Sequence, residues 1–160
     1  MKTTWNTTRG VRPKRRRGSA VVEAAVVLPF IILFLLGILE YGRFVMTLQV
    51  LTNAAREGGR YALAHTEPVT IGGTTYGNAT SDVTNIVSQF SAGQNLTGQT
   101  IQVYASDTFG NNQGPWIDAG VGESICVRIT GNYNFVVPQM LKLPSSIPVV
   151  AQAVTRSEGN

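Results

Sequence analysis

The chain has 160 residues, 43% of them hydrophobic, and a formal net charge of +4. That length allows one modest domain and one anchor. Seven of the thirteen basic residues lie in residues 1–18, and from residue 19 onward six basic residues face nine acidic ones, so the composition argues against a nucleic-acid-binding surface, which would need basic groups clustered on the folded part.

The N-terminal segment predicts a membrane-spanning helix. Residues 1–18 form a basic leader, and from Ala20 to Leu39 the only charged residue is Glu23. Twenty helical residues extend about 30 Å, the thickness of a bilayer's hydrocarbon core. A secretory signal would have a shorter apolar region, followed by a small-residue cleavage site. We therefore predict a transmembrane helix over residues 19–40, with the basic leader on the cytoplasmic side because positive charge stays inside.

The residues around Gly18 indicate a processing site. A cut between Gly18 and Ser19 would make Ser19 the first residue and Glu23 the fifth. A carboxylate costs a few kcal/mol near the centre of a bilayer and less near its edge. The new amine of a neighbouring subunit would offer it a cationic partner during assembly. In the alternative interpretation, Glu23 stays at the membrane interface and pairs with Arg17 or with lipid headgroups.

Helical periodicity continues past the membrane segment. Small and apolar residues recur at spacings of three and four, which mark one helix face: Tyr41, Phe44, Leu48, Leu51, Ala55, Gly58 and Ala62. We expect one helix from about residue 19 to 64, whose extension over residues 41–65 packs on a small domain. Pro29 predicts a modest kink, and Gly58-Gly59 predicts either an early helix end or close packing.

The remainder, residues 66–160, predicts an extracytoplasmic α+β domain with a short second helix and about three antiparallel strands. The expected elements are a loop or short hairpin at 69–80, a helix at 82–91 and strands at 100–105, 123–137 and 147–155. The middle strand carries an irregularity at Gly131-Asn132. The stretch 106–122 shows no periodicity, and its Trp116 is either an exposed contact residue or an aromatic folded back on the sheet.

No constellation of catalytic residues is visible. The single histidine, His65, and the single cysteine, Cys126, lie about sixty positions apart, without a nucleophile elbow, a phosphate-binding loop or zinc-ligand spacing. Cys126 falls in an alternating apolar run, which is typical of a strand residue rather than a reactive thiol. We predict no enzyme activity, no cofactor and no metal site.

Three blocks of sequence, Arg17–Pro29, Gly37–Arg43 and Leu51–Ala62, resemble the TadE-like family, the pseudopilins of tight-adherence (Flp-type) pilus systems. In that family an aromatic residue often follows the early glutamate, where Ala24 stands here. Besides the segment around the early glutamate, the residues that carry the resemblance are Pro29, Glu40, Gly42, Arg43, Asn53, Arg56, Glu57, Gly58 and Arg60.

The resemblance implies a minor pilin-like subunit of the bacterial inner membrane, which helps to initiate, anchor or cap a pilus used in adhesion and biofilm formation. It implies cleavage between Gly18 and Ser19 by a prepilin peptidase, and it makes Glu23 the assembly acid. The implied partners are that peptidase, other pilin-like subunits, the assembly machinery and membrane lipid, but no nucleic acid. The alternative function is an uncleaved single-pass membrane protein whose outer domain binds a ligand or an envelope partner.

Overall fold

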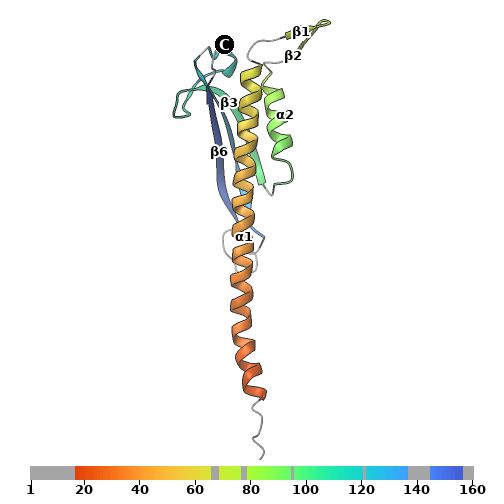
Figure 1. The fold of residues 1–160 in the computed structure, drawn as a ribbon, viewed down its shortest axis with the longest axis vertical. Helices are drawn as coiled ribbons and strands as arrows, with labels where there is room; N and C mark the ends of the chain where they lie inside the picture. The colour runs from red at the N-terminus through yellow and green to blue at the C-terminus, as the bar shows by residue number, and fades with distance from the viewer. Residues whose placement is uncertain are drawn as a thin grey trace, which may run out of the picture. The chain divides into compact units, whose positions relative to one another are not determined.

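The structure is a computed structural model that describes residues 17–65, 69–76, 79–94, 96–120, 122–136 and 145–156. The chain divides into two compact units, residues 1–36 and 37–160. The helix α1 (Arg17–Ala64) supplies all the described structure of the first unit and continues into the second. The second unit also contains the strands and the other helices (Figure 1).

In the first unit, α1 is an unaccompanied apolar helix. Every described side chain from Ser19 to Leu35 is exposed, including Phe30 and Phe34, which are both 70% exposed. Pro29 lies within the helix without ending it. A helix satisfies its backbone hydrogen bonds internally, so such a segment suits a lipid environment. By length and composition, the described part of the chain contains one helix that could cross a membrane, and it begins at Gly18.

The second unit is built on an antiparallel sheet. Its three long strands are β3 (Leu96–Ser106), β5 (Ser124–Asn134) and β6 (Ser146–Arg156). A short strand, β4 (Asn112–Gly114), completes the order β4-β3-β5-β6. The predicted α+β class is therefore confirmed, although the short fourth strand falls in the stretch where no periodicity was visible.

The strand β5 lies at the centre of the core. Its alternate side chains Ile125, Val127, Ile129 and Tyr133 are all 0% exposed, as the period of two predicts. The irregularity expected at Gly131-Asn132 is found in the pairing of β5 with β3. Asn132 pairs with Thr97 and Thr130 pairs with Thr100, so two residues of β3 lie opposite Gly131, whereas the β5–β6 pairing is unbroken there. The register shift lies in the partner strand β3, between Thr97 and Thr100, where Gly98 has a φ of +64° and so allows a bulge.

Two helices contribute to the core with this sheet, the second half of α1 and α2 (Thr80–Phe90). A Cβ atom on Gly58 would collide with Val87 of α2 and would lie 3.5 Å from Val127. A Cβ atom on Gly59 would collide with Thr155 of β6. Of the two interpretations of this glycine pair, close packing is therefore correct, and the helix continues to Ala64.

Smaller elements settle two further expectations. The strands β1 (Val69–Ile71) and β2 (Thr74–Tyr76) pair as a hairpin, as one of the two interpretations of this stretch predicted. The 3-10 helix η1 (Trp116–Asp118) buries Trp116 to 2% exposure, and its indole Nε1 donates a hydrogen bond to Thr80 Oγ1 at 2.9 Å. Trp116 is therefore a packing residue and not an exposed contact. Cys126 is a buried strand residue.

Candidate functional site

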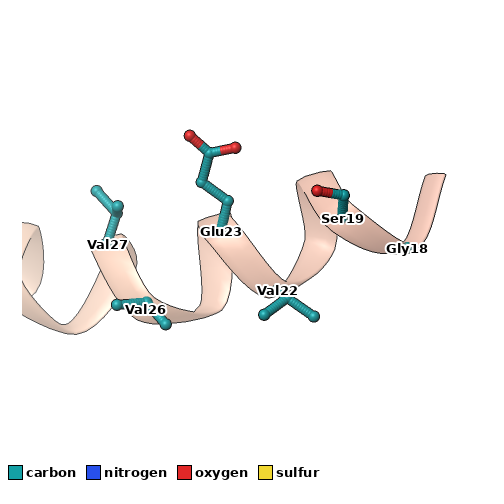
Figure 2. A pocket seen from close by; sticks show the side chains of 6 residues that line it. All are labelled: Gly18, Ser19, Val22, Glu23, Val26 and Val27. Atoms are coloured by element: carbon teal, nitrogen blue, oxygen red, sulfur yellow. The ribbon is translucent and has the colours of Figure 1, made fainter. Parts of the chain in front are cut away.

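The predicted processing constellation lies at the start of α1. Figure 2 shows Glu23 and Val27 projecting from one side of the helix and Val22 from the other. Ser19 precedes Glu23 by four residues, so the two side chains lie on the same helical face. Together with Gly18 and Val26, these residues line an open surface on the helix and not a closed pocket.

The environment of these residues is unobstructed within the described part of the chain. A Cβ atom on Gly18 would meet no atom within 4 Å, and the side chains of Ser19 and Glu23 are exposed. The two ion pairs among the described side chains are Arg43–Glu40 and Arg60–Glu57, and neither involves Glu23. The carboxylate of Glu23 therefore depends on something outside these contacts for a cationic partner.

A second acid, Glu40, has a different environment. It is only 8% exposed, and its Oε1 accepts hydrogen bonds from the Tyr133 hydroxyl at 3.2 Å and from the Val136 backbone N–H at 3.3 Å. Its Oε2 lies 3.8 Å from Arg43 Nη1. Buried carboxylates are found with such donors because an unpaired one would be costly. Glu40 thus ties α1 to the end of β5.

The Tyr133 ring, whose hydroxyl donates to Glu40, packs against two other aromatic rings. The ring of Tyr133 meets Phe44 edge-on, with centroids 5.5 Å apart, and meets Phe135 in the same way at 5.2 Å. Burial, together with the negative charge of Glu40, raises the pKa of Tyr133. The hydroxyl therefore remains a neutral donor toward the carboxylate over the physiological range. The sequence resemblance singles out Glu40 but gives no sign of these donors, which lie more than ninety residues further along the chain.

The other residues that carry the resemblance divide by exposure. Gly58 is explained by its approach to Val87, as described above. Asn53 and Arg56 are exposed, and the pair Arg60–Glu57, at 3.4 Å, is a surface contact of the kind that contributes at most about 1 kcal/mol. A Cβ atom on Gly42 would meet nothing within 4 Å. Packing within the described residues accounts for the buried members of the set and not for the exposed ones.

Metal-ligating groups do not converge in the described part of the chain. No cluster there of three or more His, Cys, Asp or Glu side chains could hold a metal ion. The Nδ1 of His65 lies 2.9 Å from the backbone oxygen of Tyr61, and the two rings stack with centroids 4.0 Å apart. The histidine thus has a local structural environment near the end of α1.

Comparison with known proteins agrees with the motif blocks. A family model described as "TadE-like protein" matches residues 18–60, a segment that includes Gly18, Ser19, Glu23 and Glu40. Neither the curated proteins nor the solved structures give a significant match. The family indicates a pilin-like protein associated with tight-adherence pili, their subunits and their assembly machinery. Residues 18–60 are thus similar to the TadE-like family, the same family that the three motif blocks resemble.

Proposed function

We propose that this chain is a minor pilin-like subunit, a pseudopilin, of a tight-adherence pilus, where it helps to initiate, anchor or cap assembly. The observation that carries the proposal is the composition of α1. Its first half is apolar and exposed and begins with Gly18-Ser19 and Glu23, whereas its second half contributes to the core of the second unit, residues 37–160, which we call the head. In this role the chain acts through binding to its neighbours and not as an enzyme.

The physical steps follow from charge and hydrophobicity. The basic leader holds the N-terminus in the cytoplasm, α1 spans the inner membrane, and the head stands outside. A prepilin peptidase cuts between Gly18 and Ser19. The new amine of one subunit then pairs with Glu23 of a neighbour. This pairing removes the cost of an unpaired carboxylate within lipid, and so it favours the assembled state over the isolated subunit.

Cleavage is tested by intact-mass measurement of the full chain expressed in membranes, with and without a prepilin peptidase. We expect the loss of residues 1–18 only when the peptidase is present. The variant Gly18→Val should resist cleavage, and Gly37→Val is its matched control, since a Cβ atom at either glycine meets nothing within 4 Å. Retention of the leader under all conditions would contradict processing and would favour the uncleaved single-pass alternative.

The assembly role of Glu23 is tested separately. In cells that depend on this subunit, Glu23→Gln should reduce the number of surface pili because the amide cannot form the ion pair. Glu57→Gln removes an acid from the same helix at an exposed surface pair and serves as the control, with pilus number unchanged. Normal piliation by the Glu23→Gln variant, at equal membrane levels of protein, would refute the role given to this carboxylate.

A further inference from the structure

Glu40 is the first buried residue of α1 within the second unit. The residues Ala20–Leu39 contain a single charge, Glu23, and twenty helical residues are enough for a hydrocarbon core of about 30 Å. Glu40 is the next residue, and its side chain points into the head, where it is buried. Along the sequence, the first buried residue of the second unit therefore follows directly after the last residue of the apolar run.

The bond from the Val136 N–H to Glu40 Oε1, at 3.3 Å, brings the end of β5 to this level. The same level carries exposed apolar and aromatic side chains from two distant parts of the chain. Leu39 is 64% exposed, Tyr41 69% and Val136 55%. The side chain of Arg43 is 48% exposed. An aromatic residue and a cation just beyond an apolar span are the pair that anchors helices in the headgroup layer.

We propose that this end of the head, defined by Leu39, Tyr41, Arg43 and Val136, is a membrane-contact surface whose partner is the lipid bilayer itself. The inference rests on the proposed function, because it requires α1 to span a membrane. The headgroup layer is roughly 5–7 Å thick on each side of the hydrocarbon core, and Val136 lies one hydrogen bond from the residue at the boundary. The side chain of Val136 therefore enters that layer, and Arg43 reaches the lipid phosphates.

The position of Phe109 provides an internal reference at the other end of the sheet. It follows Ser106, which pairs with Ser124 at the start of β5, whereas Val136 follows the end of that strand at Asn134. Ser124 and Asn134, the two ends of β5, are ten residues apart along the strand, which places them about 30 Å from each other. Phe109 is 83% exposed, so both positions accept a label without disturbing the core.

The test uses the full chain in vesicles of phosphatidylcholine and phosphatidylglycerol that carry a nitroxide on the lipid. A fluorescent label is placed on Val136→Cys, Phe109→Cys and Ile32→Cys, the last of which reports on the span. Cys126 is buried, and the unmodified chain measures its background labelling. We expect quenching of the labels at Ile32→Cys and Val136→Cys to exceed that at Phe109→Cys several-fold. If the label at Ile32→Cys is quenched but the label at Val136→Cys is quenched no more than that at Phe109→Cys, the proposed contact surface is refuted and the membrane anchor still stands. An unquenched label at Ile32→Cys would overturn both.

Discussion

Replacing Tyr133 by phenylalanine removes one hydroxyl and leaves the aromatic packing in place. The lost bond is the one to Glu40 Oε1, at 3.2 Å. A hydrogen bond to a charged group contributes about 1.5–3 kcal/mol. This bond is longer than the usual 2.5–2.7 Å for a hydroxyl and a carboxylate, and Glu40 retains the Val136 N–H and Arg43. We therefore expect the free energy of unfolding to fall by about 1.5 kcal/mol, the lower end of that range.

Urea unfolding of the full chain in detergent, followed by tryptophan fluorescence, measures this loss, because Trp116 is buried in the head. Tyr61→Phe is the matched control, since the Tyr61 hydroxyl has no hydrogen bond among the described residues, and it should cost less than about 0.5 kcal/mol. A double-mutant cycle with Glu40→Gln should give a coupling energy of about 1 kcal/mol. If Tyr133→Phe costs no more than Tyr61→Phe, the carboxylate does not hold the head as the geometry indicates.

Three further predictions concern packing and pH. Gly58→Val should lower the free energy of unfolding by about 1–3 kcal/mol, because the new side chain would collide with Val87 in a filled core. Gly42→Val, at an open position, is the control, and equal urea midpoints for the two variants would contradict the prediction. The pKa of Tyr133 is raised in the folded state. The stability that the neutral hydroxyl contributes is therefore full below the ordinary pKa of 10.0 and is lost as the pH rises through the higher folded pKa. With Tyr133→Phe as the reference, a free energy of unfolding that stays flat in this alkaline range would refute the prediction. Hydrogen bonds from the side chain and backbone of Asn111 lower the pKa of Asp107. The Asp107 carboxylate accepts hydrogen bonds from two backbone N–H groups, and their protection from exchange should hold above its ordinary pKa of 3.8 and weaken as the pH falls through the lower folded pKa. Amide exchange measures this protection, and protection factors that stay unchanged down to acid pH would count against the prediction.

Periodicity predicted much of the fold because most of its elements are long and bury one face. The alternation of Ile125, Val127 and Ile129 marks a strand, and the three-and-four spacing from Tyr41 to Ala62 marks a helix. The short strand β4 has only three residues and no buried side chain, so it leaves no pattern. The irregularity was predicted at Gly131-Asn132, and the register shift does lie opposite Gly131. The sequence did not indicate that the extra residue belongs to the partner strand, where Gly98 adopts the positive φ.

The site was predictable where the chemistry is local and not where it is tertiary. Gly18, Ser19 and Glu23 lie within six residues of one another, so their arrangement on one helix can be read directly from the chain. Glu40 obtains its donors from Tyr133 and Val136, and no local pattern indicates that these residues return to the middle of α1. A buried acid beside an apolar span becomes interpretable only when its tertiary partners are known.

The mature form of the native chain tests the central proposal most directly. Cells that carry the gene should be fractionated and the chain's intact mass measured in each fraction. We expect a membrane-bound polypeptide that begins at Ser19 and retains the whole head. A native chain found in the soluble cytosol, with residues 1–18 still attached, would contradict both the membrane anchor and the role in pilus assembly.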